Sequence, residues 1–179
     1  FYSIDLILVK HFFNAADAGN YAVVSLIGKV VFFASFSVVQ VMFPKVVELS
    51  ENKGAHKSLM WKSFAVIALI TLPILIVYYL FGDFVVNLLF GGTYLGVVGL
   101  IAPYGVFMMS VSFSKLLSLY MLSLKKFNFI YLFLIFFVLE IFLIWLYHDS
   151  LEQVIMVLDW LGLAFMAFML FMVSGVRQK

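Results

Sequence analysis

The sequence contains no cysteine among its 179 residues. This absence excludes disulfides, thiol catalysis and cysteine-ligated metal sites. Charged residues are also scarce: they make up 11% of the chain, whereas soluble domains contain about 25%. The net charge is only +2 and the basic residues gather mainly in short loops, so nothing indicates nucleic acid as a partner. The composition therefore argues against a soluble domain and against a nucleic-acid-binding module.

Motifs of the common enzyme classes are absent as well. The chain has no HExxH, no GxSxG and no phosphate-binding loop, and Gly91-Gly92 is typical of a turn. We therefore expect neither an enzyme nor a bound cofactor. The chain begins with a hydrophobic segment that lacks the basic region and cleavage site of a signal peptide. We interpret this start as a cut through a helix, and the sequence as a C-terminal piece of a longer protein.

Apolar residues fill most of the chain. They make up 66% of it, and the mean hydropathy is +1.18. Because a spanning helix needs about 20 mostly apolar residues, these stretches predict an all-α integral membrane protein. We expect a bundle of about six transmembrane helices with the first one truncated. The approximate spans are residues 1–13, 21–47, 61–81, 97–124, 127–147 and 151–173.

Two connections between these spans carry turn signals. Residues 14–20, NAADAGN, predict a turn between the first two spans. After the third span, Asp83 can cap a short helix that lies in the membrane interface, and Gly91-Gly92 then ends it.

Lysine and arginine are unevenly distributed between the loops, and this predicts the orientation. The turns at 14–20, 82–96 and 148–150 contain neither residue. The alternate segments hold seven: Lys53, Lys57, Lys62, Lys125, Lys126, Arg177 and Lys179. Because cytoplasmic loops carry an excess of basic residues, we expect a multi-pass protein of the cytoplasmic membrane with a cytoplasmic C-terminus. An outer aromatic belt fits this orientation, with Tyr21, Tyr78, Tyr79, Trp145 and Tyr147.

Four ionisable residues inside the predicted spans lie at a similar depth. At 1.5 Å per residue, the depth below the outer surface is about 13 Å for Asp5, about 12 Å for Lys29 and Asp159, and about 10 Å for Glu140. A charge at the centre of a membrane helix costs roughly 2.5–3.5 kcal/mol, and such residues usually face a bundle interior or a water-filled cavity. We therefore expect these four to line the inside of a transport protein.

This layer holds three carboxylates and one ammonium group. One alternative is mutual neutralisation, in which Lys29 pairs with a carboxylate and the pair is structural. Two carboxylates would then still need a bound cation, a proton or a water-filled cavity. Oxygen ligands suit a hard cation such as Na⁺. A hard cation and a proton therefore both remain open.

Further polar residues extend the pattern. Gln40 lies eleven residues after Lys29, roughly 20° from the same helix face, and Ser25 belongs to the same stripe. Lys115 lies on the inner half of its span, with Ser112, Ser114 and Ser118 nearby. Lys10 lies about 6 Å from the outer surface and can extend its ammonium group to it.

Short motifs give the first part of the chain a family resemblance. Residues 5–44 contain an aspartate before an apolar run, an AG-Y turn, a Gly-Lys pair in the next helix and an MFP end. Residues 87–105, NLLFGGTYLGVVGLIAPYG, contain an LFG..Y pattern. These motifs resemble the second lobe of polysaccharide flippases of the O-antigen type, in the multidrug/oligosaccharidyl-lipid/polysaccharide exporter superfamily. The resemblance covers most of residues 4–125, and beyond it only hydropathy and spacing match.

The resemblance implies one lobe of a two-lobed transporter that works by alternating access. The partners it implies are membrane lipid, the missing N-terminal lobe of the same protein and an undecaprenyl-pyrophosphate-linked oligosaccharide. The implied function is translocation of that oligosaccharide across the cytoplasmic membrane for surface polysaccharide biosynthesis, coupled to an ion or proton gradient.

The resemblance also implies roles for the residues inside the spans. Basic cavity residues of such proteins face the anionic pyrophosphate, which makes Lys29 the first substrate-binding candidate. Lys115 and Lys10 follow it, and Gln40 joins them from the polar stripe. In some relatives a carboxylate on the first helix of this lobe helps to hold a coupling cation. Asp5 occupies that position, which makes it the candidate for a sodium ion, and no other metal is expected. Two further carboxylates are coupling candidates by depth, Glu140 and Asp159.

Two other functions remain open at this point. A multidrug or small-molecule cation antiporter of the same superfamily would contact its substrate with the carboxylates and not with the lysines. A non-transporting scaffold subunit of the membrane would have all its intramembrane charges paired and buried without water.

Overall fold

The computed structural model describes residues 3–51 and 56–175. Within these residues the chain is helical and has no strand. The elements are α1 (Ile4–Phe12), α2 (Ala15–Glu51), α3 (His56–Phe90), the 3-10 helix η1 (Gly92–Val97), α4 (Val98–Ser123), α5 (Phe129–Leu146) and α6 (Leu151–Ser174). In the described part of the chain, five segments are long and apolar enough to cross a membrane. The predicted all-α, multi-pass bundle is therefore confirmed, with α1 as its short first helix.

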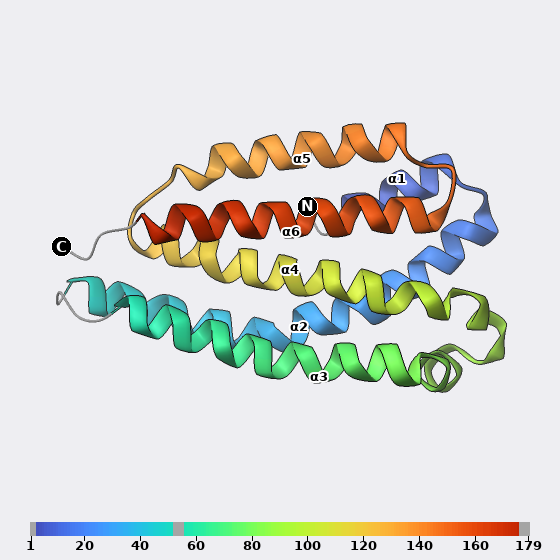
Figure 1. Ribbon diagram of the computed structural model, residues 1–179, viewed down its shortest axis with the longest axis horizontal. Coiled ribbons are helices and arrows are strands. Elements are labelled where there is room, and N and C mark those ends of the chain that lie inside the picture. The colour runs from blue at the N-terminus through green and yellow to red at the C-terminus, as the bar shows by residue number, and fades with distance from the viewer. Residues whose placement is uncertain (1–2, 52–55, 176–179) are drawn as a thin grey trace.

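The helices lie alongside one another in an elongated bundle (Figure 1). Helix α4 is central, because it packs against α2, α3 and α6 and most of its side chains are buried. Helix α5 covers α6, and α1 packs against α2 and α5. Figure 1 also shows that α1 runs beside only one half of the bundle.

The connections gather at the two ends of the bundle (Figure 1). Helix α2 ends and helix α3 begins at one end of the bundle, where α4 also connects to α5. We call it the basic end because Lys57, Lys62, Lys125 and Lys126 lie there. The other three connections lie at the opposite end. Three residues that the orientation prediction also uses lie outside the described residues: Lys53, Arg177 and Lys179. The side of the membrane that each end faces stays a prediction.

Helix α2 begins earlier than the sequence predicts. The break after α1 covers only Phe13 and Asn14, because Asn14 caps the new helix. Its side-chain oxygen accepts a hydrogen bond from the Asp17 N–H at 2.9 Å, and its amide donates to the Asp17 carboxylate at 2.8 Å. This reciprocal pair satisfies a backbone N–H that the first helical turn leaves free. The expected turn at 14–20 is therefore mostly helix.

Helix α3 extends through the segment predicted as a separate short helix. Phe81 has non-helical angles, φ −129° and ψ 29°, so the predicted boundary appears as a kink. Beyond it the helix continues to Phe90. Gly91 then adopts φ +77°, a left-handed conformation that favours glycine, and ends the helix where the sequence predicts.

Two apolar clusters fill the bundle, one in each half. The cluster near the opposite end includes Ile101 and Tyr104 of α4, and the cluster near the basic end includes Leu116 and Tyr120 of the same helix. A polar contact accompanies the second cluster: His56 Nδ1 and the Tyr120 hydroxyl form a hydrogen bond of 2.9 Å between α3 and α4. Helix α4 therefore contributes to the core of both halves.

Candidate functional site

Asp5 of α1 is fully buried against α2 and α4. Its Oδ2 atom accepts hydrogen bonds from the hydroxyl groups of Tyr21 and Tyr104, both at 2.7 Å. The Tyr104 hydroxyl also lies 3.1 Å from Ser25 Oγ, within hydrogen-bond distance. We call Asp5, Tyr21, Ser25 and Tyr104 the Asp5 cluster. Because hydrogen bonds to an ionised acceptor are the strong ones, the two tyrosines stabilise a carboxylate inside an apolar bundle.

Glu140 of α5 lies beside this cluster. It is 1% exposed, and its helix packs against α1, which carries Asp5. The two carboxylates are close enough for their charges to repel each other. Neither of the Glu140 carboxylate oxygens has a hydrogen-bond partner among the described residues. The Asp5 Oδ1 atom has none there either. An unsatisfied buried acceptor costs about 1–3 kcal/mol, and more when it is charged. A bound cation or a proton at these three oxygens would offset that cost.

The donor set fits both alternatives that the sequence left open. Three carboxylate oxygens without donors are ligands of the kind that a hard cation such as Na⁺ prefers. A proton would instead turn one carboxylate into a hydrogen-bond donor. No group of three or more histidine, aspartate or glutamate side chains gathers in residues 3–51 or 56–175. Asp5 and Glu140 are therefore the pair that would hold either species.

The structure does not bring Asp159 to the Asp5 cluster. Asp159 lies on α6 and lines two grooves. One, of about 730 Å³, lies between α3, α4 and α6, and the other, of about 420 Å³, lies between α4 and α6. Pro103 and Val106 of α4 line both grooves, whereas Tyr104 faces α1 and α2. The predicted layer of four charges therefore divides, with Asp5 and Glu140 together and Asp159 on another side of α4.

Lys29 has no ion-pair partner among the described residues. Its side chain is half-buried on α2, and the donors to Asp5 are tyrosine hydroxyls. Mutual neutralisation of Lys29 and a carboxylate is therefore not observed. A cation at membrane depth without a counter-ion needs water or an anionic ligand.

Lys29 shares a helix face with Phe36 and Gln40. Phe36 follows Lys29 by two helical turns and Gln40 by about one turn more. From α4, Lys115 places its Nζ 5.8 Å from the centre of the Phe36 ring, within cation–π range. We call Lys29, Phe36, Gln40 and Lys115 the cationic face. Since Ser25 lies one turn from Lys29, this face adjoins the Asp5 cluster along α2.

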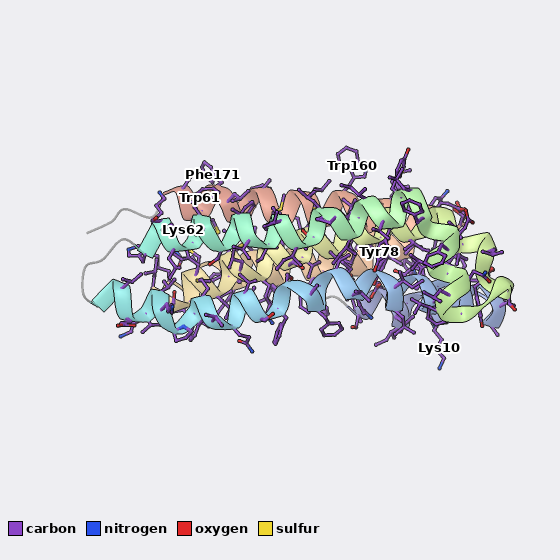
Figure 2. The ribbon with its side chains drawn as sticks, turned by 90° about the horizontal axis from the view of Figure 1, so that it is seen from below. Lys10, Trp61, Lys62, Tyr78, Trp160 and Phe171 are labelled. Carbon is purple, nitrogen blue, oxygen red and sulfur yellow. The ribbon has the colours of Figure 1, made fainter. Side chains whose placement is uncertain are left out.

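Lys10 belongs to neither site. Its side chain is exposed and points away from the bundle near the opposite end (Figure 2). Of the four substrate-binding candidates, Lys29 and Gln40 lie on one face of α2, about 16 Å apart along the helix. Lys115 lies against Phe36 of that face, and Lys10 lies apart.

Sequence reasoning missed the two tyrosines of the cluster. Tyr21 was assigned to an interfacial belt, but it is fully buried and donates to Asp5. The late predicted start of α2 caused this error. With the helix beginning at Ala15, Tyr21 lies about 9 Å along it and Asp5 about 10 Å before the end of α1. The corrected boundary would have placed both residues at one level.

We expect Tyr21→Phe to destabilise the bundle. The change removes one of two donors to a buried carboxylate while keeping the ring, so the expected loss is about 1–2 kcal/mol. Thermal unfolding of the full-length protein in detergent measures it. Tyr79→Phe is the matched control, because Tyr79 of α3 is 81% exposed. Equal unfolding temperatures for the two variants would contradict a stabilising Tyr21–Asp5 bond.

The fold and the site together define a class: a multi-pass helical membrane protein with buried carboxylates and a separate cationic face. A family model described as polysaccharide biosynthesis protein matches residues 1–99, more than half of the chain. The chain therefore belongs to this family of polysaccharide biosynthesis proteins, which confirms the resemblance at that level. The matched residues include most of the Asp5 cluster and Lys29. No curated protein and no solved structure matches the chain.

Proposed function

We propose that this chain is one lobe of a transporter that moves a lipid-linked oligosaccharide across the cytoplasmic membrane for surface polysaccharide assembly. The transported molecule would be an undecaprenyl-pyrophosphate-linked sugar unit of the O-antigen kind, moved by alternating access between this lobe and an N-terminal lobe of the same protein. The protein would perform no chemical reaction on it. Its basic end and C-terminus would face the cytoplasm.

The observation that carries this proposal is the cationic face. Lys29 and Lys115 lie within apolar spans, half-buried, and neither has an ion-pair partner in the described part of the chain. A pyrophosphate supplies the missing negative charge, and lysine ammonium groups are good point-charge donors to phosphate. Gln40 and Phe36 beside them offer a polar and an aromatic contact for the attached sugar.

The Asp5 cluster supports coupling of this movement to a cation gradient. Asp5 and Glu140 lie on α1 and α5, while the donors to Asp5 lie on α2 and α4. A proton or cation that enters between the two carboxylates changes the charge in this four-helix contact. Since Lys29 is one turn from Ser25 on α2, that change acts next to the proposed pyrophosphate position.

The same contacts bear on the two other functions. A scaffold subunit predicts that every intramembrane charge is paired, but neither Lys29 nor the Glu140 carboxylate has a partner in the described residues. A cation antiporter would use Asp5 and Glu140 and leave the lysines without a role. The unpaired lysines therefore favour an anionic substrate.

Lys29→Ala tests the proposal in the full-length protein. We expect surface polysaccharide to fall about tenfold, because one charge-assisted contact to the pyrophosphate is lost while Lys115 remains. Polymer is measured on cells whose only copy of the gene carries the change, after membrane insertion has been verified. Lys62→Ala is the control, since Lys62 is exposed at the basic end (Figure 2). Unchanged polymer levels with Lys29→Ala would refute the assigned substrate contact.

A further inference from the structure

A pocket of about 320 Å³ lies in the half of the bundle nearer the basic end. Phenylalanines from three helices form its walls, and the α4 side contributes the polar groups. Its lining includes Phe32, Phe129, Phe133, Phe165, Ser114 and Lys115. Ligand pockets span about 300–1,000 Å³. This one is therefore too small for a whole sugar repeat and matches one end of a larger molecule.

The Ser114 hydroxyl is a buried polar group in this pocket that has no hydrogen-bond partner among the described residues. The residue is 3% exposed, and its Oγ has no hydrogen bond within the described chain. The other serines of α4 each donate to a backbone carbonyl three or four residues earlier: Ser110, Ser112, Ser118 and Ser123. Buried hydroxyls are normally bonded, so the Ser114 hydroxyl is a free donor that lines a cavity.

Lys115 brings a charge to the same pocket. It follows Ser114 directly on α4, about 12 Å from the end of that helix. The pocket lies between α2, which provides Phe32, and α5, which provides Phe129 and Phe133. Helix α5 packs along α6 and against α1, while α2 packs along α3 and α4. Because α1 runs beside only the other half of the bundle (Figure 1), the pocket faces sideways between α2 and α5.

We propose that this pocket binds the phosphate and the first isoprene units of a polyprenyl phosphate lipid. The phosphate oxygens accept hydrogen bonds from Ser114 Oγ and Lys115 Nζ, and the isoprenoid chain lies against the phenylalanine walls. Both side chains are donors, which suits an acceptor-only phosphate. The branched, apolar chain suits a wall of aromatic rings. This inference rests on the proposed function, because it assigns a position to the lipid part of the same substrate.

The test measures binding of farnesyl phosphate to the purified full-length protein in nanodiscs. We expect saturable binding to the unchanged protein, and an affinity about tenfold lower for Lys115→Gln and for Ser114→Ala, which each lose a charge-assisted hydrogen bond. Ser112→Ala is the matched control: Ser112 lies on the same helix but donates to Met108 O, so its affinity should not change. Phe133→Trp enlarges a partly exposed wall and should block binding while both donors remain.

Three outcomes would overturn this inference. Farnesyl phosphate fails to bind the unchanged protein, or it binds all four variants equally, or dioleoyl phosphatidic acid binds as tightly and depends on the same residues. The third outcome would make the pocket a general phospholipid contact. None of these outcomes concerns polymer export, so the Lys29→Ala experiment still decides the proposed function separately.

Discussion

Asp5→Asn is expected to reduce surface polysaccharide to background in cells whose only copy of the gene carries it. Asparagine keeps the size of the side chain but can neither hold a proton at neutral pH nor supply a full negative charge to a cation. Both proposed ways of coupling need that charge, because Asp5 Oδ1 and the two Glu140 oxygens have no other partner in the described part of the structure. Glu140→Gln removes the second carboxylate and should give the same phenotype.

The Asp5 result depends on separating coupling from folding. Asp83→Asn is the control, since Asp83 is exposed beyond the kink of α3 and should export normally. Membrane insertion and unfolding temperature of Asp5→Asn are measured alongside. A variant that inserts into the membrane, unfolds near the normal temperature and gives no surface polysaccharide supports a role of Asp5 in coupling. Normal amounts of surface polysaccharide with Asp5→Asn would show that the Asp5 cluster takes no part in transport. Its tyrosines would then have a purely structural role.

The composition and the long apolar stretches predicted the fold closely, because a bilayer leaves few alternatives to a helix bundle. The errors lie where local capping competes with turn-forming composition. NAADAGN contains Gly, Asp and two Asn, which favour turns, yet the Asn14–Asp17 pair starts a helix there. At Phe81 the boundary was correct, but the chain bends without leaving the helix. Composition shows where a chain can turn, and side-chain hydrogen bonds decide whether it does.

The site was harder to predict than the fold. Depth along a helix is one coordinate, and it placed Asp5, Glu140 and Asp159 at one level. Direction around the helix is the second coordinate, and it depends on which neighbours pack where. Asp5 and Glu140 lie on α1 and α5, which pack against each other, whereas Asp159 lines the grooves that α6 forms with its neighbours. Tyr104 also has no local signal, since its contact with Asp5 joins residues 99 positions apart.

Gly28→Ala is expected to disturb the Asp5 cluster without changing any of its polar atoms. A Cβ at Gly28 of α2 would overlap the ring of Tyr104, which is itself fully buried. The ring cannot move outward, because α4 is packed on three sides. Overpacking a tight interior costs about 1–3 kcal/mol, and moving Tyr104 also breaks its 2.7 Å bond to Asp5. We therefore expect both a lower unfolding temperature and loss of polymer export.

The same helix supplies the control for Gly28→Ala. Gly19 lies in α2 with nothing within contact distance of its virtual Cβ, so Gly19→Ala should be neutral or stabilising by up to about 1 kcal/mol from helix propensity.

The double variant Gly28→Ala/Tyr104→Leu removes the overlapping ring and its hydroxyl. It should regain part of the lost stability without regaining export, because the donor to Asp5 is still missing. Full export with Gly28→Ala would show that the Tyr104 position is dispensable. Restored export in the double variant would show that packing at Gly28, and not the tyrosine hydroxyl, is what transport requires.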